Sequence, residues 1–374
     1  MKINLTQNKN FKLFKIISKV AQENNQTVYI VGGYVRDLLM QRKAPTDIDF
    51  VTEQSGIELA KAVGKELGDL KVSVFKTYGT AMIKYKDLDL EFVGARKESY
   101  SEDSRKPAVE TGTLEDDQKR RDFTVNALAI SLNAENFGEL IDPFNGREDM
   151  LNKILRTPLE PAQTYSDDPL RMMRAIRFAS VLHFEIEKNS LEAIKQEAER
   201  IKIVSMERIM VEFNKIMLSE KPSVGLKLME ETTLLEKIIP ELTALRGIEE
   251  VEGQTHKDNF WHTLEVVDNI SKNTDNLWLR WAALLHDIGK APTKKFVEKI
   301  GWTFHGHEFL GSKMVKALFT RLKLPLGTDM KYVQKMVKLS SRPIALIDDD
   351  ATDSALRRLL FDAGEDLEDL FTLC

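Results

Sequence analysis

The chain of 374 residues is too long for one ordinary core, and its composition, 42% hydrophobic and 30% charged, excludes a disordered protein and indicates two or three globular domains. The net charge of −5 argues against a general nucleic-acid binder, so any contact with a polyanion must come from local basic clusters. The single cysteine, Cys374, excludes an intrachain disulfide and a thiolate cage, which leaves carboxylates and histidines as metal ligands.

Residues 1–141 alternate between strand and helix patterns, which is typical of a small α/β domain. The predicted elements are, in chain order, a strand at 28–33, a helix at 34–41, a strand at 47–52, a helix at 56–69 and up to three strands within 71–95. Turn residues at Tyr78-Gly79 and Lys86-Asp87 separate these last strands.

From about residue 150 onward the strand signals vanish and helical periodicity takes over. The clearest helical stretches are 169–184, 207–219 and 278–291. Turn residues near Asp142 mark a first hinge, and the polar stretch 243–255, which lacks a clear period, marks a second. We therefore expect an α+β chain with an α/β head at 1–141, an all-helical neck at 142–245 and a helical body at 246–374.

Two glycines and two aspartates form the first candidate site. Gly32 and Gly33 follow a predicted strand and precede a helix, so their backbone amides could face an anion such as a triphosphate. Asp47 and Asp49 are spaced i, i+2 on a predicted strand and present two carboxylates on one face, where a cation would relieve their repulsion. Oxygen ligands beside a phosphate favour Mg2+ or Mn2+. Each feature alone has another interpretation: the glycines could form a tight turn without a ligand, and the aspartates could be a solvated acidic pair.

The stretch RRDFTVNALA, residues 120–129, carries a second set of polar groups ahead of a predicted helix. Arg120 and Arg121 can grip phosphate oxygens in a fork, and Asp122 and Asn126 can hydrogen-bond ribose hydroxyls. An aspartate helix N-cap with solvated arginines is the alternative interpretation.

Asp168 and Arg171 are three residues apart on a predicted helix, so an acceptor and a fork of donors share one face. Such a pair matches the base edges of cytosine and adenine, whereas uracil and guanine present a carbonyl where Asp168 needs a donor. A bidentate contact of this kind discriminates between bases by about 1–3 kcal/mol. A surface ion pair worth a few tenths of a kcal/mol is the alternative. Arg174 and Arg177 continue the same side of the helix.

Five motifs follow one another between residues 28 and 218: GGYVRD with DIDF, RRDFTVNAL, DPFNGRED, DDPLRMMRAIRFA and SMERIMVEFNKIM. In this order they resemble the motifs of class II tRNA nucleotidyltransferases, the CCA-adding enzymes, and of related bacterial poly(A) polymerases within the DNA polymerase beta superfamily. The resemblance implies a polymerase-beta-like head with catalytic Mg2+ or Mn2+ on Asp47 and Asp49 and a third carboxylate at Glu91. It implies a nucleotide-binding set of Gly32, Gly33, Arg36, Arg120, Arg121, Asp122, Asn126, Asp168, Arg171, Arg174 and Arg177.

A histidine at the start of HTLEVVDN and an adjacent His-Asp pair in LLHDIGKAP resemble the HD superfamily of metal-dependent phosphohydrolases. The resemblance implies a second metal site whose ligands are His262, His286, Asp287 and Asp353. His305 and His307 could extend it, whereas Ser340 stands where HD-bearing nucleotidyltransferases often have histidine. The alternative is a helical body that retains the motif for packing.

The resemblances together imply template-independent addition of C, C and A to the 3′ end of tRNA from CTP and ATP, with release of pyrophosphate. Poly(A) addition, CC-only or A-only addition, an HD-type phosphohydrolase and a non-catalytic RNA-binding module are the alternatives. The charged residues 96–112 are expected to form a flexible loop that takes part in the switch to the terminal A.

No apolar leader and no run of eighteen apolar residues occurs, so we expect a cytoplasmic protein without a membrane segment. Relatives usually continue well past the last residues DLEDLFTLC, so a fragment or a shortened form is expected. The sequence does not indicate an oligomeric state.

Overall fold

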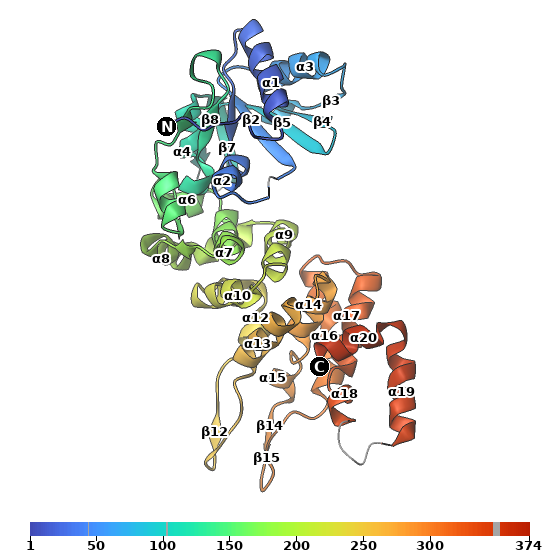
Figure 1. Ribbon diagram of the computed structural model, residues 1–374. Coiled ribbons are helices and arrows are strands. Elements are labelled where there is room, and N and C mark those ends of the chain that lie inside the picture. Colours follow the sequence, from blue (N-terminus) through green and yellow to red (C-terminus); the bar gives the residue numbers. More distant parts are fainter. Residues whose placement is uncertain (44, 102–103, 347–351) are drawn as a thin grey trace. The chain divides into compact units, whose positions relative to one another are not determined.

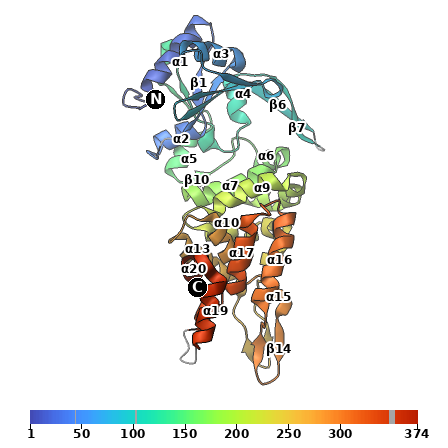
Figure 2. The same cartoon turned by 90° about the vertical axis from the view of Figure 1, so that its right-hand side faces the viewer.

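The computed structural model describes residues 1–43, 45–101, 104–346 and 352–374, and the chain forms two compact units. The head unit comprises Met1–Asp168 with Glu185–Ser190, and the helical unit comprises Pro169–Phe184 with Leu191–Cys374. Figures 1 and 2 show a mixed sheet with helices in the head unit and a set of packed helices in the helical unit. The α+β class is thus confirmed, while the division into head, neck and body stays a prediction.

A seven-stranded mixed sheet forms the centre of the head unit, with the strand order β3-β4-β5-β2-β1-β8-β9. The strands are β1 (Tyr29–Val31), β2 (Asp47–Thr52), β3 (Val72–Phe75), β4 (Thr80–Tyr85), β5 (Leu88–Gly94), β8 (Ala129–Ser131) and β9 (Leu140–Ile141). β2 and β5 pair in parallel, and every other pair in this sheet is antiparallel. The strands expected at 28–33, 47–52 and within 71–95 are confirmed.

Helices and 3-10 turns precede, connect and follow the strands of this sheet. They are α1 (Phe11–Glu23), α2 (Gly33–Leu39), α3 (Gly56–Glu66), α4 (Leu114–Lys119), α5 (Gly146–Leu151) and α6 (Pro161–Asp167), with 3-10 turns η1 (Lys76–Tyr78), η2 (Thr124–Asn126) and η3 (Ala134–Asn136). Phe14 of α1 meets Phe50 of β2 edge-on, and Phe50 stacks on Phe92 of β5 at 4.9 Å. Because side chains alternate along a strand, Asp47 and Asp49 face away from this core.

The hairpin β6 (Arg96–Ser101) and β7 (Ser104–Thr111) occupies the stretch that was expected to be a flexible loop. The expectation of a loop is wrong for the described residues, which form an antiparallel ladder from Arg96 opposite Thr111 to Ser101 opposite Ser104, while the role in the switch to the terminal A stays a prediction. Backbone hydrogen bonds build such a ladder, so it can form without the apolar anchors whose scarcity suggested a loop.

The helical unit consists mainly of helices, as predicted. They are α7 (Leu170–Leu182), α8 (Lys188–Glu197, shared with the head unit), α9 (Met206–Met217), α10 (Pro222–Glu231), α11 (Leu234–Ile238), α12 (Pro240–Thr243), α13 (Asn259–Ser271), α14 (Leu277–Leu285), α15 (Lys290–Thr293), α16 (His307–Arg321), α17 (Thr328–Leu339), α18 (Arg342–Ala345), α19 (Asp353–Ala363) and α20 (Leu367–Leu373), with 3-10 segments η4 (Ala198–Ile203) and η5 (Gly364–Asp366). Arg280 of α14 is buried and donates to the carbonyl oxygens of Met217 and Ser219 at 2.7 and 2.8 Å, which ties α14 to the end of α9.

Strand signals do not vanish completely after residue 150, which corrects the sequence prediction. Among the described residues after 150, three short strand pairs occur: β10 (Ile154–Leu155) with β11 (Glu185–Ile186), β12 (Glu250–Val251) with β13 (Gln254–Thr255), and β14 (Lys295–Val297) with β15 (Gly301–Thr303). Strands of two or three residues are too short to show an alternating pattern. In the part of the chain that the structure describes, no helix combines the length and apolar character needed to span a membrane.

Candidate active site

Gly32 lies at the turn between β1 and α2, and two constraints require glycine there. Its backbone has φ of 74° and ψ of −139°, a conformation that residues with a Cβ atom rarely adopt. A Cβ atom at this position would lie 2.9 Å from Nη1 of Arg121 and 3.5 Å from Oδ2 of Asp49. The glycine therefore lets the backbone approach the acidic pair and the arginine together.

The prediction that both glycine amides are free for an anion does not hold for Gly32. Its N–H donates to the carbonyl oxygen of Leu128 at 3.2 Å. The reason is that β1 pairs with β8, and this bond continues their ladder by one residue into the turn. Gly33 begins α2, where the first amides of a helix have no partner within the helix.

Acidic residues occupy neighbouring positions on one face of β2 and β5. The parallel register places Asp49 opposite Glu91 and Asp47 opposite Asp89. Asp47 is exposed, and Asp49 and Glu91 are partly buried. Burial raises the pKa of Asp49, Arg121 opposes this rise, and the charges of Asp47 and Asp117 add to it. Burial likewise raises the pKa of Glu91, and the charges of Asp49 and Asp47 raise it further. In the described residues the carboxylate oxygens of Asp47, Asp49 and Glu91 do not all lie within 4.8 Å of one another, but oxygen donors under mutual repulsion suit a hard divalent cation.

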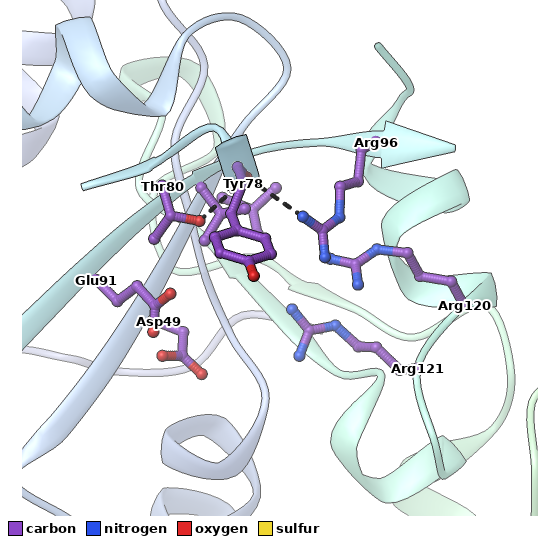
Figure 3. A pocket seen from close by; sticks show the side chains of 9 residues that line it. Asp49, Tyr78, Thr80, Glu91, Arg96, Arg120 and Arg121 are labelled. Carbon is purple, nitrogen blue, oxygen red and sulfur yellow. Dashed lines mark hydrogen bonds between the residues drawn. The ribbon is translucent and has the colours of Figure 1, made fainter. Parts of the chain in front are cut away.

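Asp49 and Glu91 open into a pocket of about 330 Å3. The residues that line it are Asp49, Val51, Tyr78, Thr80, Glu91, Val93, Arg96, Arg120 and Arg121. Figure 3 shows the two carboxylates on one side, the three arginines on the other and the ring of Tyr78 between them. The pocket therefore offers carboxylates for a cation and guanidinium groups for phosphate oxygens.

A buried carboxylate that the sequence analysis missed holds the two adjacent arginines. Asp117 of α4 is fully buried and accepts from Nε and Nη2 of Arg121 at 3.0 and 2.9 Å, and it also pairs with Arg120. Burial opposes the charge on Arg121, but Asp117 and Asp49 raise its pKa overall. Asp117 lies three and four residues before the arginines, at the end of α4, and this spacing is the signal that could have predicted the pairing.

Arg36, Asn126 and Asp122 form a second buried network beside the glycine turn. Arg36 donates from Nη1 to Oδ1 of Asn126 at 2.8 Å, and the amide of Asn126 donates to Oδ1 of Asp122 at 2.9 Å. Asp122 also accepts from the N–H of Phe123. The structure thus brings together three predicted nucleotide-binding residues and connects α2 with η2.

The remaining predicted nucleotide-binding residues fall on both sides of the boundary between the units. Asp168 closes the head unit, and Arg171, Arg174 and Arg177 lie on α7 of the helical unit. Arg177 is mostly buried, and its Nε lies 2.6 Å from Oε2 of Glu212 on α9. The guanidinium of Arg177 also lies over the ring of Phe178. Arg177 therefore has a packing role in addition to any role in binding, and the base-reading role of Asp168 and Arg171 stays a prediction.

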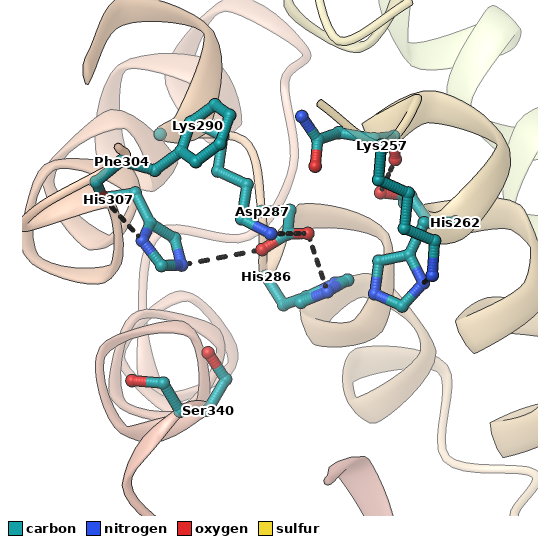
Figure 4. Close-up of polar contacts among 12 residues, drawn as sticks. Lys257, His262, His286, Asp287, Lys290, Phe304, His307 and Ser340 are labelled. Atoms are coloured by element: carbon teal, nitrogen blue, oxygen red, sulfur yellow. Dashed lines mark hydrogen bonds and ion pairs between the residues drawn. The ribbon is translucent and has the colours of Figure 1, made fainter. Parts of the chain in front are cut away.

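In the helical unit, His262, His286 and Asp287 bring ligand atoms within 4.8 Å of one another (Figure 4). His286 donates from Nδ1 to the carbonyl oxygen of Ala283 at 2.7 Å, which directs its Nε2 toward Asp287 at 3.3 Å. Burial and the nearby charge of Lys257 lower the pKa of His262, which keeps its ring neutral and able to bind a metal. The donor set therefore fits a metal ion.

Asp353, the fourth predicted ligand, is exposed at the start of α19 and does not belong to the cluster found among the described residues. Two lysines contact cluster members instead: Lys290 pairs with Asp287 at 2.7 Å, and Lys257 donates to Nδ1 of His262 at 3.0 Å. A cation bound here would compete with both ammonium groups.

Of the other residues considered for this metal site, His307 lies next to the cluster, whereas no contact with it is described for His305 or Ser340. His307 lies 3.5 Å from Oδ1 of Asp287, while His305 is exposed. Ser340 is buried and donates to the carbonyl oxygen of Val337 at 3.0 Å, a bond within its own helix end.

A mixed sheet that presents an Asp-x-Asp pair and a third carboxylate beside a Gly-Gly turn defines the nucleotidyltransferase class of fold. Three family models match successive segments of the chain. They are the Poly A polymerase head domain at residues 28–156, the probable RNA and SrmB-binding site of polymerase A at 183–245, and the HD domain at 259–360. The Multifunctional CCA protein of Pseudomonas fluorescens is 33% identical over 316 residues, covering 80% of this chain and 71% of the relative. The chain belongs to the family of tRNA nucleotidyltransferases that includes the CCA-adding enzymes.

Other relatives are longer than this chain. The A-adding tRNA nucleotidyltransferase of Aquifex aeolicus is 34% identical over 301 residues, which cover 76% of the chain but 34% of the relative. The CCA-adding enzyme of Bacillus velezensis is 36% identical over 283 residues, covering 75% of the chain and 65% of the relative. The chain thus spans between about a third and two thirds of the length of these two relatives.

Solved structures share the fold over nearly the whole chain. A tRNA-processing enzyme in an apo form has a TM-score of 0.72 at 26% identity, covering 100% of this chain and 89% of its own. A tRNA nucleotidyltransferase complexed with a primer tRNA and an incoming ATP analogue has a TM-score of 0.66 at 28% identity, covering 96% and 94%. The architecture predicted from the motifs is therefore that of known tRNA nucleotidyltransferases.

Proposed function

We propose that the chain adds C, C and A to the 3′ end of tRNA without a nucleic-acid template, using CTP and ATP and releasing pyrophosphate. The observation that carries this proposal is the pairing of Asp49 with Glu91 in a pocket that also contains Arg120 and Arg121. Family membership supports the choice of tRNA as the acceptor. The neck at 142–245 and body at 246–374 would then support the acceptor, in a protein that works in the cytoplasm.

In the proposed reaction the 3′ oxygen of the RNA bonds to the α-phosphorus of the nucleotide, and the bond from that phosphorus to the pyrophosphate oxygen breaks. Mg2+ or Mn2+ held by Asp47 and Asp49 would polarise the phosphate and acidify the attacking hydroxyl. Glu91, which lies opposite Asp49 in the sheet, can accept the hydroxyl proton. Arg120 and Arg121 balance the charge of the departing pyrophosphate.

Selection of the nucleotide rests on the other predicted residues. The Arg36, Asn126 and Asp122 network presents fixed polar groups beside the glycine turn, which suits recognition of ribose hydroxyls. Asp168 and Arg171 provide an acceptor and a fork of donors for the base edges of C and A.

The direct test uses two tRNA acceptors, one lacking the whole CCA end and one ending in CC. CTP and ATP together should restore CCA on the first, ATP alone should add one A to the second, and UTP and GTP should not be incorporated. Addition to the second acceptor alone would assign A-only activity. A long A tail on an unrelated RNA would assign poly(A) polymerase activity instead. Asp49→Ala should stop incorporation while tRNA binding persists.

A second candidate activity, metal-dependent phosphohydrolysis, is favoured by the convergence of His262, His286 and Asp287. Hydrolysis of phosphoester substrates should then need Asp287 but not Asp49, and nucleotide addition should need Asp49 but not Asp287. Both activities measured on Asp287→Ala and Asp49→Ala separate the two sites.

A further inference from the structure

The stretch DPFNGRED, residues 142–149, begins with a hydrogen-bonded turn and leads into α5. The carboxylate of Asp142 accepts hydrogen bonds from the backbone N–H groups of Gly146 and Arg147 at 2.7 and 2.9 Å. These bonds satisfy amides at the start of α5, which have no partner within the helix. The stretch belongs to the head unit, and α5 packs against the short turn η2.

Gly146 lets α5 come into direct contact with the backbone of η2. It is buried, and a Cβ atom at this position would lie 2.2 Å from the carbonyl oxygen of Thr124. Atoms that are not bonded to each other do not approach this closely, so only glycine fits here. The first residue of α5 therefore rests on the first residue of η2.

Asp149 of α5 holds the same residue of η2 through its side chain. The hydroxyl of Thr124 donates to Oδ2 of Asp149 at 2.7 Å, and both side chains are buried. Nε of Arg156 lies 3.2 and 3.3 Å from the two carboxylate oxygens of Asp149, and the N–H of Thr124 donates to the carbonyl oxygen of Arg156 at 2.8 Å. The three residues thus form a closed set of hydrogen bonds in which Arg156 balances the buried charge.

The last residue of η2 belongs to the network beside the glycine turn. Asn126 follows Thr124 by two residues, accepts from Arg36 and donates to Asp122. A 3-10 turn of this length has few rotatable bonds between its ends, so the placement of its first residue determines that of its last. Thr124 and Asn126 therefore link Asp149 to the groups that suit a ribose.

We propose that Asp149, acting through Thr124, is a positioning residue for recognition of the 2′-hydroxyl of the incoming nucleotide. The inference rests on the proposed function, because a ribose is recognised only if the site takes CTP and ATP. Asn126 held in place keeps the carboxylate of Asp122 aligned to accept a hydrogen bond from that hydroxyl. The 2′-hydroxyl is the group that distinguishes a ribonucleotide from a deoxyribonucleotide. The preference for ribonucleotides would then depend on a buried carboxylate of α5.

The test measures equilibrium binding of CTP and of 2′-deoxy-CTP. Thr124→Val, which keeps the shape of the side chain without its hydroxyl, and Asp149→Ala should each raise the Kd for CTP roughly tenfold, the effect of one lost hydrogen bond to a charged group. The Kd for 2′-deoxy-CTP should stay unchanged. Thr124→Ser keeps the hydroxyl and should bind both nucleotides like the parent chain. Glu148→Gln, at an exposed neighbouring position of α5, is the matched control and should also bind normally.

A role confined to stability would lower the melting temperatures of Thr124→Val and Asp149→Ala and leave the ratio of the two Kd values as in the parent chain. That result, or an equal rise of both Kd values, would overturn the inference, as would equal affinity of the parent chain for the two nucleotides. The double variant should match the single ones, because both remove one hydrogen bond; additive effects would also contradict the inference.

The proposed function is tested separately, by extension of tRNA that lacks the CCA end. If the parent chain binds CTP but does not extend this tRNA, the proposed function fails. The ratio of the Kd values then still decides whether Thr124 and Asp149 support recognition of the ribose. A parent chain that binds neither nucleotide would refute both.

Discussion

Asp117 accepts two hydrogen bonds from Arg121 through a single carboxylate oxygen, at 2.9 and 3.0 Å, and is itself fully buried. Removing one partner of such a pair leaves a buried charge uncompensated, which costs about 3–5 kcal/mol. Asp117→Ala should therefore lower the free energy of unfolding by about that amount and reduce nucleotide addition, because Arg120 and Arg121 lose their support. Asp116→Ala is the control, since Asp116 is only partly buried and contributes a capping interaction with Thr113. Equal losses in the two variants, measured by urea denaturation, would contradict this role.

The same carboxylate predicts a pH dependence of stability. Burial raises the pKa of Asp117, but the charges of Arg121 and Arg120 outweigh it, so the pKa in the folded state is lowered. Its contribution to stability should be fully present above the unfolded pKa of about 4 and should be lost as the pH falls through the folded value. The difference in unfolding free energy between the parent chain and Asp117→Asn should therefore shrink below pH 4. If this difference in unfolding free energy stayed constant from pH 3 to pH 7, stability would not depend on ionisation of Asp117.

Gly32→Ala combines backbone strain with crowding of the site. The conformation of Gly32 costs a residue with a Cβ about 1–3 kcal/mol, and the added atom would displace Arg121. We expect nucleotide addition to fall at least tenfold. Gly68→Ala is the matched control, because Gly68 also has a positive φ, 104°, but a Cβ there meets open space. Steady-state rates for both variants, alongside their melting temperatures, would separate strain from damage to the site; equal rates would contradict the prediction.

Arg171 and Arg177 lie on the same helix, but replacing them should change different properties, base selection for Arg171 and stability for Arg177. Arg171→Ala should weaken discrimination against UTP and GTP roughly ten- to hundredfold, because a bidentate base contact is lost. Arg177→Ala should mainly lower stability, since Arg177 pairs with the buried Glu212. Misincorporation assays with each nucleotide test the first expectation and thermal unfolding tests the second. Unaltered exclusion of UTP and GTP by Arg171→Ala would remove it from base selection.

The histidine cluster should bind a divalent transition metal, with Mn2+ as the probe. His286→Ala should weaken binding at least tenfold because it removes one of three converging ligands. Lys290→Met should strengthen binding, since the ammonium group that competes for Asp287 is gone. Titration calorimetry on an Asp49→Ala background isolates this site. Asp353→Ala, at an exposed position, should bind normally; a loss there would support the four-ligand set implied by the sequence.

Much of the head unit was predictable because its signals are local. The alternation in DIDFVT and LDLEFVG determines which side chains of β2 and β5 face the core, and the pairing of the two strands then brings Asp49 beside Glu91. The hairpin β6–β7 was missed because backbone pairing leaves little trace in a charged sequence. Asp117 was missed because its burial depends on how a six-residue helix packs, which periodicity does not reveal. The amide of Gly32 was misjudged because its acceptor, Leu128, is distant in sequence.

The burial of Arg280 has a consequence for how the chain can be dissected. Arg280 belongs to the segment that matches the HD domain, yet two of its acceptors, the carbonyl oxygens of Met217 and Ser219, belong to the segment that matches the RNA-binding part of polymerase A. Cutting the chain near residue 250 would remove both of these acceptors and expose the side chain of Arg280, which is now buried. The segments that match these two family models therefore belong to one compact unit, and the histidine cluster should be studied with its upstream helices attached.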